Sequence, residues 1–158
     1  MEVVIDNTVL SNFALIQRVE LLHKVFDGGA TTSQHVWNEL QIGEKQGVIP
    51  ENDWSDIKVL ELSSDLEKTT FERIKQKLGT GESACLSLAI HRNLKVLTDD
   101  LDARKYAQRR GIPVSGSIGV LILAIRKKLI SLGGGNDLLL QMIQKGYYSP
   151  YQKLDGLI

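Results

Sequence analysis

A short apolar run that ends in acids is the feature that most constrains this chain. The run is Leu94–Leu97, and Asp99, Asp100 and Asp102 follow it closely. An apolar run of this length between polar residues predicts a buried strand, and Ala103–Arg110 predicts a helix after it. The acids therefore stand at the carboxyl end of a strand, where open parallel α/β sheets bind ligands. The alternative is that they cap the helix, but a cap uses only one of the three.

The length and composition predict one globular domain that spans residues 1–158. A hydrophobic fraction of 42% and a charged fraction of 24% are ordinary for such a domain and argue against disorder. The longest apolar run, Val120–Ile125, is too short to cross a bilayer, and no signal peptide is predicted. The single cysteine, Cys85, excludes an internal disulfide and fits a reducing compartment. We therefore expect a cytoplasmic protein with no membrane partner.

The charge balance limits how a nucleic acid could be bound. The chain has 19 basic and 19 acidic residues, so its net charge is zero. Overall charge cannot hold a polyanion, and a local basic patch would be required. The chain has no Gly-Lys-Ser/Thr sequence, which excludes a Walker P-loop.

A second acid follows a second predicted strand. Val3–Ile5 is a β-branched run that ends at Asp6, and a helical pattern begins just after it. Asn7 or Thr8 is the expected cap of that helix, and Asp6 as the cap is the alternative.

Two glutamates lie on other predicted helices. Ser33 is expected to cap a helix on which Glu39 lies near the buried side, although a lone Glu on a helix is usually solvated. Gly79 is expected to end one helix and Thr80 to cap the next, which places Glu82 in a first turn. The alternative role of Glu82 is to complement the helix dipole.

The remaining pattern predicts short strands and a broken C-terminal region. Strands are expected at residues 30–32, 57–62 and 112–114, followed by a turn at 115–119 and a helix at 120–129. Gly133–Gly135 predicts a break, with Asn136 or Asp137 capping a last helix. A tail with Tyr147, Tyr148 and Tyr151 ends the chain.

Acids gathered at one sheet edge are costly without a cation, because neighbouring carboxylates repel and raise one another's pKa. Oxygen ligands favour Mg²⁺ or Mn²⁺ over zinc, and the three histidines share no metal-ligand spacing. Acidic pockets of this kind serve phosphodiester hydrolysis.

Five segments, taken in order, resemble the successive motifs of PIN domains. The resemblance runs from about Val3 to Leu129, which defines a motif-bearing core at about 3–129 and leaves a C-terminal helix and tail at 130–158. It is closest to small, single-domain prokaryotic PIN proteins similar to VapC-type toxins. The five segments are Val4–Thr8, Val36–Glu39, Gly81–Ala84, Leu97–Asp100 and Val114–Leu121.

The resemblance implies a three-layer α/β/α fold with a central parallel sheet of about four to five strands, and metal-dependent ribonuclease activity. The family more often has Asp at the third acidic position, where this chain has Glu82, and Asp99 competes with Asp100 for the fourth. Carried over, the catalytic acids are Asp6, Glu39, Glu82 and Asp100, with Asp6, Glu82, Asp100 and Asp99 as metal ligands and Thr8, Thr98 and Asp102 in support.

We therefore expect an endoribonuclease that acts on RNA with Mg²⁺ or Mn²⁺. Its basic residues Arg104, Lys105, Arg109 and Arg110 are expected to contact phosphates, and the alternative is a solvated helix face. The resemblance also implies a toxin role with a small antitoxin partner, and the tyrosine tail is expected to serve docking or homo-oligomerisation.

Two other functions are compatible with the pattern. The first is a PIN-fold module that binds RNA or a protein without turnover. The second is a phosphatase with Asp6 as nucleophile, but such enzymes expect a second Asp where this chain has Thr8.

Overall fold

The computed structural model describes residues 2–158 and has a five-stranded parallel sheet between layers of helices. This confirms the three-layer α/β/α fold. The strand order is β3-β2-β1-β4-β5, and each neighbouring pair is parallel. The strands are β1 (Val3–Ile5), β2 (Ala30–Ser33), β3 (Lys58–Leu60), β4 (Lys95–Leu97) and β5 (Val114–Ser115).

The central strand β1 explains why the sheet forms where the sequence places it. Its residues Val3, Val4 and Ile5 are fully buried, because helices cover both faces of the sheet. Parallel strands covered on both faces are expected to be continuous hydrophobic runs rather than alternating ones. β1 pairs with β2 on one side and with β4 on the other. The carboxyl ends of β1 and β4, which carry the acids, are therefore neighbours.

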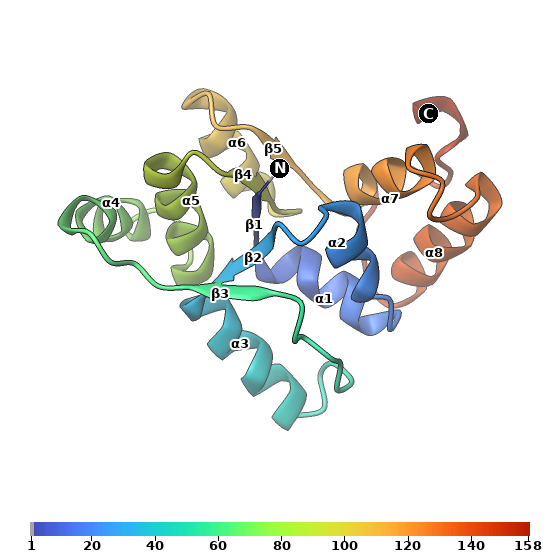
Figure 1. Cartoon of the computed structure of the whole chain (residues 1–158), viewed down its shortest axis with the longest axis horizontal. Helices are drawn as coiled ribbons and strands as arrows, with labels where there is room; N and C mark the ends of the chain where they lie inside the picture. Colours follow the sequence, from blue (N-terminus) through green and yellow to red (C-terminus); the bar gives the residue numbers. More distant parts are fainter. Residues whose placement is uncertain (1) are drawn as a thin grey trace.

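The helices divide between the two faces of the sheet (Figure 1). α5 crosses β1, β2 and β4 on one face, with α4 and α6 beside it. α1 and α7 pack together with α8 on the other face, where α2 contacts α7. α3 contacts both α1 and α5. The helices are α1 (Asn7–Leu15), α2 (Glu20–Val25), α3 (Gln34–Lys45), α4 (Asp65–Lys75), α5 (Thr80–Arg92), α6 (Leu101–Arg109), α7 (Ser117–Arg126) and α8 (Leu132–Gln144), with a final 3₁₀ turn at Asp155–Leu157.

Several helix starts differ from the prediction by one to three residues. The caps of α1 and α5 are Asp6 and Gly79 rather than Asn7 or Thr8 and Thr80, and neither makes a side-chain capping hydrogen bond. α7 begins at Ser117 instead of Val120, because β5 ends at Ser115 and the turn is shorter than expected. The Ser33 cap is confirmed, since its hydroxyl accepts a hydrogen bond from the Val36 N–H.

The predicted break at the three glycines is wrong. α8 runs through Gly133–Gly135, and its cap is Ser131, which accepts from the Gly134 N–H at 2.9 Å, rather than Asn136 or Asp137. The packing explains the helix: a Cβ built on Gly135 would lie 2.7 Å from Ile125 Cδ1 on α7. A glycine there lets α8 lie close to α7, and tertiary contact outweighs the low helix propensity of glycine.

The hydrophobic core includes the C-terminal region. Leu138, Leu139 and Met142 of α8 are buried, and so is Leu154 in the tail. None of the helices in residues 2–158 is long and apolar enough to cross a membrane.

The glycines of α8 provide a test of this packing. We expect Gly135→Leu to lower the free energy of unfolding by about 1–3 kcal/mol, because the added atoms overpack the contact with Ile125 and Leu154. The matched variant Gly133→Leu should be neutral or stabilising, since Gly133 is exposed and its nearest neighbour is 3.9 Å from a built Cβ. Urea denaturation of both variants measures the difference. Equal effects at the two positions would contradict the close α7–α8 contact.

Candidate active site

Four of the predicted acids lie at the carboxyl edge of the sheet and influence one another electrostatically. Asp6 follows β1, Asp100 follows β4, Glu82 is in the first turn of α5, and Glu39 is on α3. Burial is the largest cause that raises the pKa of Asp6, Glu39 and Glu82. The charge of Glu82 adds to it at Asp6 and Glu39, and the charge of Asp100 adds to it at Glu82. Segments far apart in the chain thus bring like charges together.

Asp6 is the most buried of these acids, with 1% of its surface exposed. Its Oδ2 accepts hydrogen bonds from the hydroxyls of Thr98 at 2.9 Å and Thr8 at 3.3 Å. Its Oδ1 is buried and makes no hydrogen bond of standard geometry among residues 2–158, although the Asn7 backbone N–H is near enough to the carboxyl to lower its pKa. Burial, and then the charges of Glu82 and Glu39, raise the pKa of Asp6 to about 7. An unpaired buried carboxylate oxygen is an unusual cost for a fold to carry.

Two threonines tie Asp6 to the end of β4. The Thr8 hydroxyl donates to Asp6 and accepts from the Asp99 N–H at 2.9 Å. The Thr98 hydroxyl donates to Asp6 and accepts from the Asp100 N–H at 3.2 Å. Each hydroxyl can donate once and accept as well, so each threonine links one acid's side chain to another acid's backbone. The structure thus places Thr8 and Thr98 in contact with the acidic group.

Glycines make room for the two glutamates. A Cβ on Gly79 would overlap Glu82 Oε2, and a Cβ on Gly81 would lie 2.7 Å from Glu39 Oε1. Burial is the main cause that raises the pKa of both glutamates. A hydrogen bond from the Asn7 side chain acts in the opposite direction on Glu39. Asn7 was predicted only as a helix cap, and nothing in its local sequence indicates this contact across to α3.

Asp99 and Asp100 have different surroundings although they are adjacent. Asp100 caps α6, since its Oδ2 accepts from the Ala103 N–H at 2.8 Å, and its charge acts on Glu82. Asp99 Oδ1 accepts from the Ser117 N–H at 2.9 Å, and its Oδ2 accepts from the Ser117 hydroxyl at 2.5 Å and from Asn12 Nδ2 at 2.9 Å. Asp99 therefore joins α1 and α7, while Asp100 faces the acidic group.

No sequence pattern indicates Asn12 and Ser117 as partners of Asp99. They lie 87 and 18 residues from it along the chain. Asp102, predicted to support the site, lies on the exposed side of α6 beside Lys105 and Arg109 rather than among the four acids.

The predicted basic residues divide between two hollows. Lys105, Arg109 and Arg110 line a hollow of about 390 Å³ with Lys77. Arg104 points to another side of α6, where its Nη1 donates to the Thr98 carbonyl at 3.1 Å and it lines a hollow of about 600 Å³. The four residues therefore do not form one patch.

The acidic group fits a hard divalent cation by its chemistry, although its side chains are not arranged as a closed metal site. Within residues 2–158 no group of three or more His, Cys, Asp or Glu side chains is placed so as to hold a metal ion. The free Oδ1 of Asp6 and the raised pKa values of three carboxyls are what oxygen ligands show when no cation compensates their charges.

Comparison with known proteins identifies a family for the chain. Residues 2–158 match a family model described as a PIN domain. No curated protein matches the chain. PIN domains are generally nucleases, and they generally use divalent metal ions.

The raised pKa of Asp6 predicts a pH-dependent stability of the metal-free protein. Its carboxyl has a pKa of about 7 when folded against an ordinary value of 3.8, so its contribution to stability is complete below about pH 4 and is lost as the pH rises through 7. In chelator, Asp6→Asn should therefore raise the free energy of unfolding most at pH 8, on the order of 2–4 kcal/mol. The melting temperature should rise with it. The gain should shrink toward pH 4.

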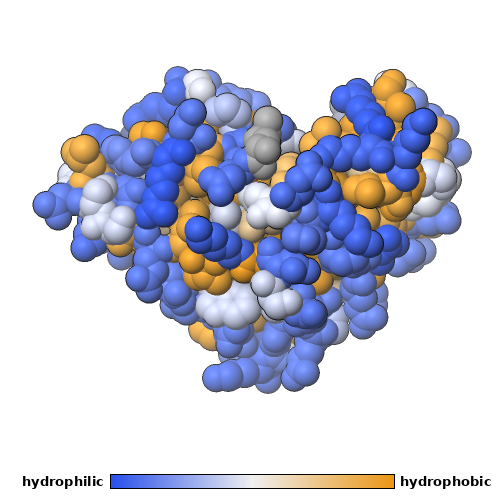
Figure 2. All heavy atoms as spheres, in the orientation of Figure 1, coloured by the Kyte–Doolittle hydropathy of each residue, from blue (hydrophilic) through white to orange (hydrophobic). Residues whose placement is uncertain are grey.

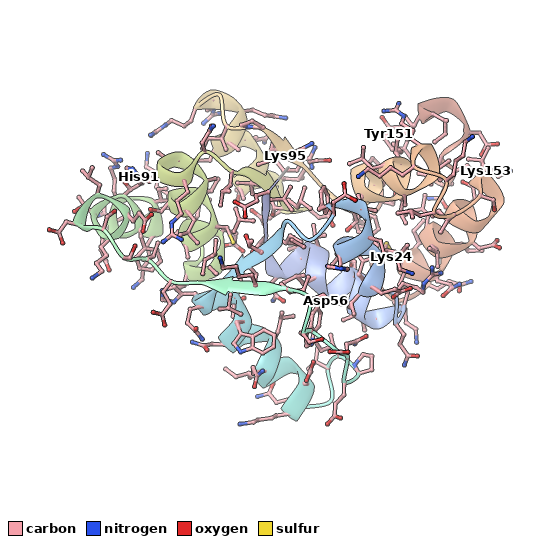
Figure 3. All side chains as sticks on the ribbon, viewed as in Figure 1. Lys24, Asp56, His91, Lys95, Tyr151 and Lys153 are labelled. Carbon is pink, nitrogen blue, oxygen red and sulfur yellow. The ribbon has the colours of Figure 1, made fainter. Side chains whose placement is uncertain are left out.

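Thermal melts at several pH values measure this effect. Asp56→Asn is the control, because Asp56 is exposed and precedes β3 (Figure 3). A gain at Asp6 that does not depend on pH would show that Asp6 is not the group with the raised pKa.

Proposed function

The chain belongs to the PIN domain family, and we propose that it is an endoribonuclease that uses Mg²⁺ or Mn²⁺ to hydrolyse phosphodiester bonds in RNA. One observation carries the proposal: four separate segments place mutually repelling acids at the carboxyl edge of the sheet, with Asp6 Oδ1 left unpaired. A fold maintains such repulsion where function requires it.

The hydrogen bonds assign a role to each oxygen of Asp6. Both threonine hydroxyls donate to Oδ2, which leaves Oδ1 free to bind a cation. Glu82 and Asp100 are the other proposed ligands, because the charge of Glu82 acts on Asp6 and the charge of Asp100 acts on Glu82. A bound divalent ion would supply an activated water and stabilise charge at the phosphorus.

We propose that Glu39 accepts the proton of the attacking water. Burial, and then the charge of Glu82, raise the pKa of its carboxyl, which makes the carboxylate a better proton acceptor. The Asn7 side chain and the Gly81 backbone favour the ionised form of the carboxylate. Asp99 is not proposed as a ligand, because Asn12 and Ser117 already engage both of its oxygens.

The basic hollow provides a path for the RNA backbone. Lys77, Lys105, Arg109 and Arg110 line it, with Asp102 as the only acid in its lining. Leu78 also lines it and directly precedes Gly79 at the start of α5, which carries Glu82. Phosphates bound there would enter the site from the side of α6. Because the net charge of the chain is zero, RNA binding requires a local basic patch of this kind.

Two further expectations stay predictions. A toxin role with a small antitoxin partner rests on the resemblance to VapC-type proteins. Self-association through Tyr147, Tyr148 and Tyr151 rests on their aromatic character. A binding module without turnover stays the alternative to the nuclease.

Substitutions of the neighbouring acids Asp100 and Asp99 are expected to affect different properties, cleavage for the first and stability for the second. We expect Asp100→Asn to abolish cleavage of single-stranded RNA in Mn²⁺ while keeping its stability, because Asn caps a helix as well as Asp does. Asp99→Asn should instead lower the free energy of unfolding by about 1–3 kcal/mol, since one amide oxygen cannot accept from all its present donors. Gel assays of cleavage and thermal melts measure both.

Thermal melts of the same proteins with and without Mn²⁺ test metal binding without substrate. Wild type should gain on the order of 2.7 kcal/mol when Mn²⁺ is 100-fold above its Kd, and Asp100→Asn should gain far less. If Asp99→Asn abolishes cleavage at full stability and Asp100→Asn does not, the assignment of the ligands is wrong. RNA that binds but stays uncut in Mn²⁺ would favour the binding module.

The basic hollow is tested by removing two of its charges. The double variant Lys105→Gln, Arg109→Gln should weaken RNA binding and lower the slope of log Kd against log salt by about 0.7 for each lost phosphate contact. The matched control removes Lys24 and Lys153, which lie away from this hollow (Figure 3). Fluorescence anisotropy with labelled RNA in chelator measures the slope. Equal slopes for the two double variants would exclude this path.

A further inference from the structure

A second hollow lies on the other side of α6 from the basic one. Its volume is about 600 Å³, within the range of roughly 300–1,000 Å³ that small-molecule pockets occupy. It opens between the start of α6, α7 and the C-terminal segment, where Figure 2 shows hydrophobic atoms and Figure 3 labels Tyr151. Its apolar walls are Leu101, Ile118, Ile122, Tyr148, Tyr151 and Leu157.

One end of this hollow is polar. Asp99 and Arg104 line it there, and Tyr147 lies close enough that the charges of both act on its hydroxyl. Gly116 makes room for these two side chains, because a Cβ on it would overlap Asp99 Oδ1 and would lie 2.9 Å from Arg104 Nη1. Arg104 is held by its hydrogen bond to the Thr98 carbonyl. The hollow therefore offers Asp99 Oδ1, which accepts one hydrogen bond from Ser117 and can accept another, beside the cationic donor Arg104 in an otherwise apolar space.

The position of this hollow connects it to the acidic site. Asp99 lines it, and Asp100, the next residue, faces Glu82. Thr98, whose carbonyl holds Arg104, also donates to Asp6. A group seated in the hollow would thus lie beside the same strand end that carries the acids, where we propose that a phosphate binds.

The chemistry of the lining selects a base rather than a phosphate. The Asp99 carboxylate would repel a phosphate, whereas carboxylate and guanidinium together match the donors and acceptors on the edge of a nucleobase. Tyr148 and Tyr151 are 97% and 46% exposed, and exposed aromatic rings are stacking platforms for unpaired bases. A base can enter such a hollow only from a single strand.

We propose that the hollow between α6, α7 and the C-terminal segment binds an unpaired nucleobase adjacent to the scissile phosphate. The inference rests on the proposed ribonuclease function and adds to it a separate binding site for one base of the RNA. The C-terminal tyrosines then serve substrate binding, in place of the docking or self-association that the sequence suggested.

The test measures binding without turnover, in chelator. The probes are a labelled single-stranded RNA oligomer, the same oligomer with abasic riboses, and its duplex form. Wild type should bind the single strand about tenfold or more tightly than the abasic strand, since stacking contributes about 1–3 kcal/mol per base. Tyr151→Ala and Arg104→Gln should remove most of this difference. Leu140→Ala, an exposed residue of α8 outside the hollow, is the control.

The outcomes separate this inference from the proposed function. Equal affinity of wild type for the intact and abasic strands would overturn the nucleobase pocket, even if the protein cleaves RNA in Mn²⁺. Base-dependent binding without cleavage would support the pocket and reject the nuclease. A dimer on size exclusion that Tyr151→Ala dissociates would also overturn the inference, because it would assign the hollow to a second copy of the chain.

Discussion

The buried carboxyl of Asp6 is the group on which the rest of the site depends. It sits where β1 ends, its backbone N–H donates to the Leu97 carbonyl at 2.8 Å, and its Oδ2 accepts from two threonines. These contacts fix the ends of the two central strands against each other. Because both hydroxyls point to one oxygen, the other oxygen is left without a partner. The same hydrogen bonds therefore stabilise the sheet edge and prepare a ligand atom.

Electrostatic repulsion at this edge is a cost that the surrounding fold must offset. Burial and the neighbouring glutamates oppose the ionised form of Asp6, and Glu82 is in turn opposed by Asp100. The offset comes from apolar burial around the site: Ile5, Phe13 and Leu97 are almost fully buried. Such a site is expected where stability is exchanged for function, and a cation would relieve the repulsion.

The end of β4 shows how one turn of chain serves two purposes. Asp99 joins α1 and α7, while Asp100 caps α6 and faces the acids. Arg104, one helical turn later, turns toward Asp99 and away from Lys105. The acidic site thus has a basic hollow on one side and a largely apolar one on the other. That arrangement suits a polymer with charged phosphates and flat bases, which is the substrate we propose.

The sequence by itself determined the parallel sheet, its strand ends and the acids that follow them, because apolar runs and the turns beside them are local patterns. It also predicted the Ser33 cap. It did not distinguish Asp99 from Asp100, since Asn12 and Ser117 reach Asp99 from distant segments. It placed a break at Gly133–Gly135, where contact with Ile125 instead keeps a helix. Only the tertiary structure decided these points, because they depend on contacts between elements that no local pattern encodes.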